Sequence, residues 1–151
     1  MEPAPRRVLF VCVENSNRSQ MAEAFARLHG AGRVEAWSAG SRPSGRVSPR
    51  AIEAMRELGY DLAAHTSKSL DDLPPADFDA VVTMGCGDAC PAVAAKLRLD
   101  WQIPDPRDLP PAGFRAVRDR IEREVLALLA LLGARASGAL PSPSAGPRPR
   151  G

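Results

Sequence analysis

Residues 8–23 read VLFVCVENSNRSQMAE, and the hydrophobic pattern changes its period within this stretch. Residues 8–13 are an unbroken apolar run, which is typical of a strand buried on both faces of a parallel sheet. From residue 19 to residue 29 the apolar residues recur at helical spacing, and a glycine follows them. This spacing predicts an amphipathic helix that ends at the glycine. The stretch therefore predicts a strand, a tight loop from Cys12 to Arg18, and a helix.

The rest of the chain alternates between the same two patterns. Apolar runs at 34–39, 78–84 and 99–103 predict three more strands, of which the last is the weakest. Helical spacing covers 48–59, which opens with Ser-Pro and closes with glycine, and 114–132. Strands that alternate with helices predict an α/β fold, here a single-domain three-layer α/β/α arrangement with a four-stranded parallel sheet. Ligands of such sheets bind at the carboxyl ends of the strands.

Composition indicates one globular domain. The chain has 151 residues, of which 44% are hydrophobic and 25% charged. We expect an N-terminal extension at 1–6, the domain at 7–132, and a disordered tail at 133–151, which is rich in Ala, Gly, Pro, Ser and Arg. A net charge of +2 favours neither a nucleic-acid nor a membrane partner, and no apolar run is long enough to span a bilayer. We expect a cytoplasmic monomer.

The three cysteines do not fit a secreted disulfide framework, because Cys12 is far from Cys86 and Cys90 in the sequence. Cys12 instead stands where a strand ends and a loop leads into a helix. Backbone N–H groups of such a loop and the helix dipole bind an oxyanion, and Arg18 adds a planar charged fork. The same field stabilises a thiolate. The alternative is that Cys12 only ends a buried strand and Arg18 only meets solvent.

The segment at 11–23 resembles the active-site loop of the low-molecular-weight protein tyrosine phosphatase superfamily. Within it, RSQMAE is closer to the arsenate reductase branch, because the phosphatases usually have Pro where Gln20 stands. The similarity runs from 7 to 132 in matching order. It continues through Ser38-Ala39-Gly40, His65-Thr66-Ser67-Lys68, Val81-Val82-Thr83-Met84 and Asp105-Pro106.

The resemblance implies a role for each matched position of the loop. Cys12 would be the nucleophile, and Arg18 would clamp the oxygens of the bound anion. Asn15, whose side chain tolerates left-handed backbone, would shape the loop, and the Ser19 hydroxyl would donate to the thiolate. The implied oxyanion-binding residues are consecutive: Val13, Glu14, Asn15, Ser16, Asn17, Arg18 and Ser19.

Glu14 departs from the pattern, since many relatives have glycine at this position. A carboxylate there must turn outward or oppose the bound anion.

A carboxylate between two prolines is the candidate general acid. The resemblance places Asp105 as the group that protonates the departing oxygen, and its proline neighbours limit its backbone freedom. An ordinary surface role for Asp105 is the alternative, and Asp100 and Asp108 are nearby competitors. Arg107 and Asp108 stand where the phosphatases usually have an aromatic pair, which argues against aryl phosphates as substrates.

Cys86 and Cys90 lie in GCGDACP at 85–91, which resembles a segment of reductases that use a low-molecular-weight thiol such as mycothiol. In one route, Cys86 or Cys90 attacks the arsenic bound to Cys12, arsenite leaves, and a thiol relay ends in a disulfide that thioredoxin reduces. In the other, mycothiol or glutathione attacks, and a glutaredoxin-like protein clears the adduct. Inert thiols are a third reading. Neither histidine has a zinc-ligand spacing, so we expect no metal and no tightly bound cofactor beyond an external thiol reductant.

These features together predict an arsenate reductase that retains some phosphatase activity. Its substrate would be arsenate, which phosphate or sulfate would mimic, and its partner would be a redox protein. Two alternatives stay open. The first is a low-molecular-weight protein tyrosine phosphatase or another phosphomonoesterase, because phosphate has the same tetrahedral shape. The second is a non-catalytic oxyanion-binding module in which Glu14 prevents turnover.

Overall fold

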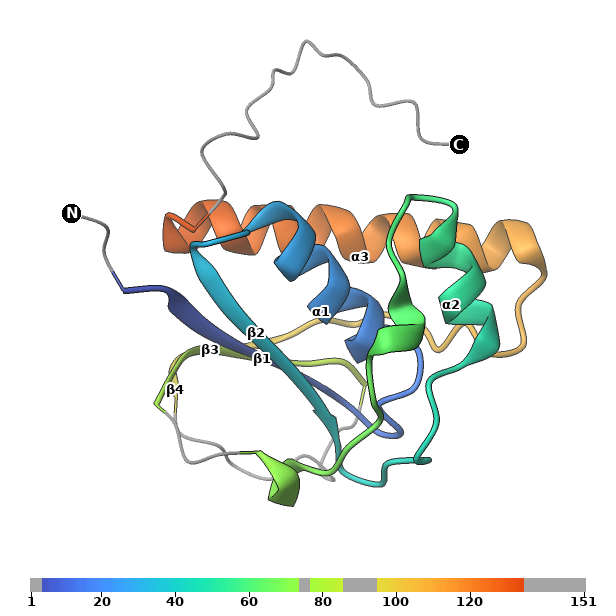
Figure 1. Ribbon diagram of the computed structural model, residues 1–151, viewed down its shortest axis with the longest axis horizontal. Helices are drawn as coiled ribbons and strands as arrows, with labels where there is room; N and C mark the ends of the chain where they lie inside the picture. The colour runs from blue at the N-terminus through green and yellow to red at the C-terminus, as the bar shows by residue number, and fades with distance from the viewer. Residues whose placement is uncertain (1–3, 74–76, 86–94, 135–151) are drawn as a thin grey trace, which may run out of the picture.

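The computed structural model describes residues 4–73, 77–85 and 95–134 (Figure 1). Its strands form one sheet in the order β2-β1-β3-β4, and every neighbouring pair is parallel. The predicted α/β class and four-stranded parallel sheet are confirmed. The strands are β1 (Arg6–Cys12), β2 (Val34–Gly40), β3 (Phe78–Thr83) and β4 (Ala95–Asp100).

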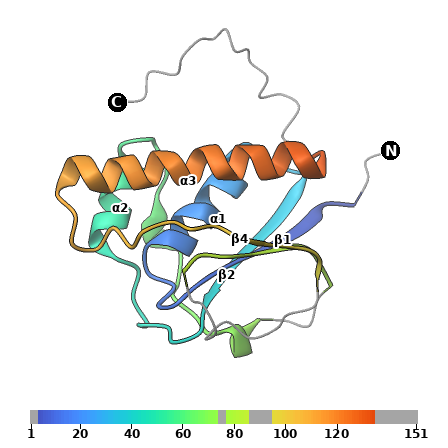
Figure 2. The same ribbon diagram turned by 180° about the vertical axis from the view of Figure 1, so that it is seen from behind.

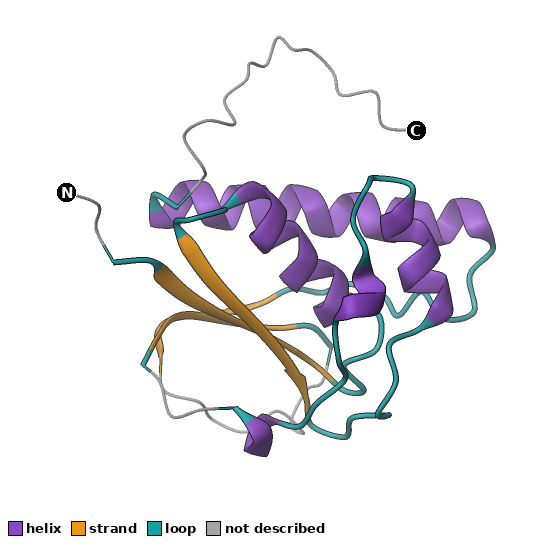
Figure 3. Cartoon of the chain, viewed as in Figure 1, coloured by secondary structure: helices purple, strands orange, loops and turns teal. Residues whose placement is uncertain are grey.

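The three α-helices of the described residues all lie on one side of this sheet, as Figures 1 and 2 show from opposite directions. The other face carries the short 3-10 helix η2, which Figure 3 shows below the strands. A second short 3-10 helix, η1, precedes it in the chain. The helices are α1 (Arg18–His29), α2 (Pro49–Arg56), α3 (Pro111–Leu132), η1 (Leu62–Ala64) and η2 (Leu70–Asp72).

The central position of β1 explains its unbroken apolar sequence. Val8, Phe10 and Cys12 point into the large core beneath the helices. Leu9 and Val11 point into the smaller core on the other face. All five are at most 2% exposed, since layers lie on both sides of the strand.

The helix ends follow local sequence signals. The Ser48 side chain accepts a hydrogen bond from Arg50 N–H, and a proline occupies the first turn of α2. Gly59, at φ 84°, turns the chain after α2, and Gly133, at φ 66°, ends α3 in the left-handed conformation. Glycine is the residue that adopts these angles most easily.

The predicted position of the fourth strand, 99–103, is wrong, because β4 spans Ala95–Asp100. This strand lies at the sheet edge, where partly buried and exposed residues alternate. An alternating strand has a weaker apolar signal than a fully buried one. Trp101 and Ile103 are buried, but they belong to the segment that leaves the sheet. Apolar character alone therefore misplaced the strand.

The predicted domain limits stay predictions. Among the described residues, the first strand begins at Arg6 and the last helix ends at Leu132. Most of the tail predicted at 133–151 lies outside the described residues. Within the described ranges, no helix has the length and apolar character that crossing a membrane requires.

Candidate active site

The loop between β1 and α1 turns its carbonyl groups away from its centre. Those carbonyls accept hydrogen bonds from the segment that follows β2. The bonds run from Ser41 N–H to Cys12 O, Arg42 N–H to Val13 O, Ser44 N–H to Glu14 O, and Ser48 N–H to Ser16 O. The N–H groups of residues 14–17 have no acceptor in the described part of the chain. Asn15, at φ 51°, makes the sharp turn. The loop can therefore offer N–H donors to an anion at its centre.

Cys12 ends β1 and is 2% exposed. Its Sγ lies 2.9 Å from the Ser19 hydroxyl, and that hydroxyl accepts a hydrogen bond from Asn15 Nδ2 at 2.8 Å. Because Asn15 supplies a donor to Ser19 Oγ, the hydroxyl proton is available to the sulfur. The backbone N–H of Lys68 donates to Asn15 Oδ1 at 2.9 Å, which sets the orientation of the amide.

Arg18 is the first residue of α1, and its side chain is 11% exposed. Its Nη1 donates to the Ile103 carbonyl at 3.0 Å, and its Nη2 lies 3.8 Å from Asp105 Oδ2. A Cβ at Gly85 would lie 2.6 Å from Nη1, so only glycine leaves room for the guanidinium there. The segments after β3 and β4 therefore position the Arg18 head group.

A cavity of about 180 Å³ opens above the loop. Drug-sized ligands occupy pockets of about 300–1,000 Å³, so this one suits a small ion. Asp105 lines the cavity, whereas Asp100 and Asp108 do not. Among the residues that the structure describes, the lining consists of Cys12, Val13, Glu14, Ser16, Asn17, Arg18, Asp105 and Arg107.

Glu14 turns its carboxylate outward to the rim of the cavity. Its Oε2 accepts from Arg107 Nη2 at 3.0 Å, and the same Nη2 lies 3.3 Å from Asp105 Oδ2. The hydrogen bond to Glu14 and the nearby Asp105 carboxylate raise the pKa of Arg107 above its ordinary value. Of the two orientations considered for Glu14, the structure has the outward one, in which the carboxylate is paired with a cation.

This geometry, with a cysteine at a strand end and an arginine at a helix start, matches a known family. Residues 7–137 match the family model described as low molecular weight phosphotyrosine protein phosphatase. The chain belongs to this family. The resemblance of the segment at 11–23 is thereby confirmed.

Several members of the low molecular weight phosphatase family are similar over most of their length. A glutaredoxin arsenate reductase of Synechocystis sp. is 40% identical over 128 residues, which cover 83% of this chain and 97% of that protein. A solved arsenate reductase in the phosphate binding state superposes with a TM-score of 0.77 at 39% identity, covering 83% and 98% of the two chains. The thioredoxin-dependent arsenate reductase of Corynebacterium glutamicum has a TM-score of 0.70 at 32% identity, covering 87% of this chain and 63% of that one.

A series of hydrogen-bonded side chains supports the family loop from behind. Gln20 Nε2 donates to the backbone carbonyls of Asn15 and Thr66 at 3.0 and 2.9 Å. Because those carbonyls only accept, the Gln20 amide oxygen faces His65 Nδ1, 3.0 Å away. His65 Nδ1 therefore carries the proton, and its Nε2 accepts from the Tyr60 hydroxyl at 2.7 Å.

A lysine occupies a polar niche beside this series. Lys68 Nζ donates to the Thr66 carbonyl at 2.9 Å and to the Ser38 carbonyl at 3.3 Å. The Ser38 hydroxyl donates to Glu23 Oε1 at 2.6 Å, so a buried carboxylate lies close by. Burial lowers the pKa of Lys68, and the Glu23 carboxylate opposes this effect.

The structure brings Cys12, Arg18, Ser19 and Asp105 to one end of the sheet, as their predicted roles require, and those roles stay predictions. Asn15 and the loop residues predicted to bind the oxyanion surround the same point. The predicted thiol pair, Cys86 and Cys90, lies outside the described residues. No group of three or more His, Cys, Asp or Glu side chains suitable for a metal was found in the ranges that the structure covers.

Sequence reasoning missed the residues that support the loop and its rim. For His65 the sequence indicates only that a zinc-ligand spacing is absent, and Gln20 and Lys68 enter only through the family resemblance. Arg107 was noted only as a replacement for an aromatic residue. One signal was available: a carboxylate such as Glu14 inside an anion-binding loop requires a nearby cation.

The free energy of unfolding should depend on His65 protonation. Burial lowers the pKa of His65 below its ordinary value of 6.5, although the Glu23 carboxylate acts in the opposite direction. The unfolded chain then binds the proton more readily, so the free energy of unfolding should fall as the pH drops below about 6.5. One such group contributes a slope of at most about 1.4 kcal/mol per pH unit.

Urea unfolding of the wild type and of His65→Gln between about pH 5 and about pH 7.5 would measure this dependence. Glutamine does not titrate, so its curve should decline less steeply on the acid side. Parallel curves would show that His65 does not contribute.

Proposed function

We propose that the chain is an arsenate reductase in which Cys12 is the nucleophile. The observation that carries the proposal is the position of Cys12 Sγ. The sulfur lies within hydrogen-bond distance of the Ser19 hydroxyl, at 2.9 Å. Cys12 also lines a small cavity together with Arg18 and Asp105. Relatives at about 40% identity named as arsenate reductases support this choice of substrate.

The chemical steps follow from these groups. The Cys12 thiolate attacks As(V), an S–As bond forms, and an As–O bond breaks. Asp105 donates a proton to the departing oxygen, which leaves as water. Arg18 and the loop N–H groups hold the remaining oxygens, where negative charge concentrates. A second thiolate then attacks the Cys12 sulfur, the S–As electron pair returns to arsenic as As(III), and a disulfide forms.

An external thiol reductant must restore the enzyme, since the reaction consumes two electrons. Names of relatives mention glutaredoxin in one case and thioredoxin in another. Cys86 and Cys90 are the proposed source of the second thiolate in the thioredoxin route, and mycothiol or glutathione takes that place in the other. The proposed compartment is the cytoplasm, whose thiol systems keep Cys12 reduced. We also propose that the chain acts as a monomer.

A phosphomonoesterase is the second candidate, because the family description names phosphotyrosine. Phosphate fits the same cavity, and its ester requires no reductant. The charged rim formed by Glu14 and Arg107 disfavours an aryl group at the mouth.

Coupled reductase assays and a separate phosphatase assay distinguish these functions. Purified protein would be given arsenate with NADPH and either a thioredoxin system or a mycothiol or glutathione system, and separately p-nitrophenyl phosphate. We expect arsenite in at least one of the reductase assays. Phosphate release without arsenite would establish the second candidate. Retention of activity in Cys86→Ser/Cys90→Ser would select the small-thiol route, and loss would select the thioredoxin route.

A further inference from the structure

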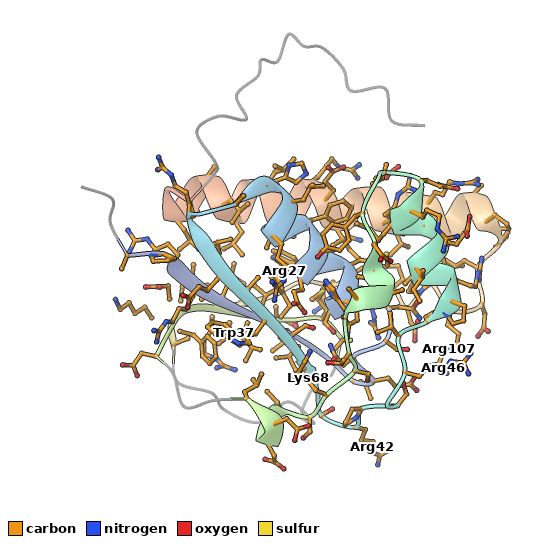
Figure 4. All side chains as sticks on the ribbon, viewed as in Figure 1. Arg27, Trp37, Arg42, Arg46, Lys68 and Arg107 are labelled. Atoms are coloured by element: carbon orange, nitrogen blue, oxygen red, sulfur yellow. The ribbon has the colours of Figure 1, made fainter. Side chains whose placement is uncertain are left out.

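Two charged side chains from distant parts of the chain meet at the mouth of the cavity. Glu14 comes from the loop after β1, and Arg107 comes from the segment between β4 and α3. Arg107 Nη2 lies 3.0 Å from Glu14 Oε2, and both residues line the cavity. The Glu14 side chain is 40% exposed and the Arg107 side chain is 52% exposed, which places the pair at the rim of the cavity and not at its floor. Figure 4 shows Arg107 at the end of the molecule toward which the strands run.

The pair also holds the candidate acid. Arg107 Nη2 lies 3.3 Å from Asp105 Oδ2, and the Arg107 backbone N–H donates to Asp105 Oδ1 at 3.0 Å. Arg18 Nη2 approaches the same carboxylate from below, at 3.8 Å. Glu14 is therefore linked through Arg107 to Asp105. The wall that carries the nucleophile and the wall that carries the acid are joined above the cavity.

We propose that Glu14 and Arg107 form a charged clasp that selects inorganic oxyanions over organic esters. This inference rests on the proposed function, because it concerns the substrate of the same site. A bare tetrahedral anion is small enough to place all its oxygens inside the cavity, which has a volume of about 180 Å³. The organic group of an ester must leave through the mouth, where it displaces the ion pair and contacts two charged groups. An apolar ring makes no compensating hydrogen bonds with them.

The size of the effect follows from the exposure of the pair. Exposed ion pairs are weak, and losing one changes an equilibrium or rate ratio by at most about fivefold. Opening the clasp should therefore raise the preference for an aryl ester over a bare oxyanion by up to about fivefold. Glu14→Gln removes the charge at constant size, and Arg107→Ala removes both the charge and the bulk. In the double variant the effects should be less than additive, because each substitution breaks the same pair.

The test measures kcat/KM for p-nitrophenyl phosphate and for arsenate in these variants. Arg42→Ala is the matched control, since it removes one arginine from the same end of the molecule without altering the cavity lining (Figure 4). A shift of up to about fivefold toward the aryl ester in Glu14→Gln and Arg107→Ala, absent from Arg42→Ala, is the expected result. An unchanged ratio, or an equal shift in Arg42→Ala, would overturn the clasp.

Binding separates the clasp from the proposed function. In a Cys12→Ser background, calorimetry would compare inorganic phosphate with phenylphosphonate, which cannot be hydrolysed. Opening the clasp should strengthen phenylphosphonate binding relative to phosphate by the same factor. If the wild type forms no arsenite, the proposed function fails, while this binding ratio still supports or overturns the clasp. Circular dichroism would verify that each variant is folded.

Discussion

Cys12→Ser is expected to abolish arsenite production while leaving oxyanion binding intact. A serine hydroxyl is not ionised at neutral pH, and it cannot form the S–As bond from which two electrons return to arsenic. Loss of a nucleophile costs roughly 10⁴-fold or more in turnover in enzymes where it has been measured. Arsenite formation in the coupled assay measures the loss.

Phosphate binding to Cys12→Ser provides the internal control for this prediction. The loop N–H groups and Arg18 do not depend on the sulfur, so calorimetry should detect binding close to that of the wild type. Arsenite production that persists in Cys12→Ser would assign the nucleophile to another thiol. Loss of both binding and turnover would instead indicate a damaged loop, since Cys12 is buried in the core.

Arg18→Lys should reduce kcat/KM for arsenate by roughly 10³-fold although the positive charge is kept. Lysine is a point donor and cannot pair with two oxygens in the plane of a fork. It also cannot hold the Ile103 carbonyl and approach Asp105 at the same time, as the two Nη atoms of Arg18 do. Steady-state kinetics with arsenate, at a fixed reductant concentration, measures the change.

Arg27→Lys is the matched control for the arginine variant. Arg27 also belongs to α1, but it lies in the last turn and pairs with Glu23 at 2.7 Å, away from the cavity lining. Figure 4 shows Arg27 well separated from Arg107 at the cavity rim. Arg27→Lys should change kcat/KM less than about twofold, as surface substitutions usually have small effects. Equal losses in the two variants would contradict a specific role for the Arg18 fork.

Local patterns were sufficient for much of the fold. The apolar run at 8–13, the glycine after His29 and the Ser48-Pro49 pair each encode an element boundary through short-range chemistry. The predicted helix at 114–132 begins only three residues late, because two prolines precede its first apolar position. The loop from Cys12 to Arg18 was also accessible, since strand, loop and helix follow one another directly in the sequence.

Contacts between distant segments were not accessible in this way. The predicted position of the edge strand β4 is wrong because the alternating burial of this strand depends on its pairing with β3, which the local sequence does not show. The sequence did not distinguish Asp105 from Asp100 and Asp108 as the candidate acid. The structure does, because Asp105 lines the cavity and the other two do not.

The sequence by itself determined the sheet class, the family and the position of the loop from Cys12 to Arg18, because each depends on residues that are neighbours along the chain. Tertiary structure alone decided that Glu14 turns to Arg107, 93 positions away, and that Gln20 meets His65, 45 positions away. Side-chain pairing across such separations depends on how layers pack, and packing brings together residues that no periodicity relates.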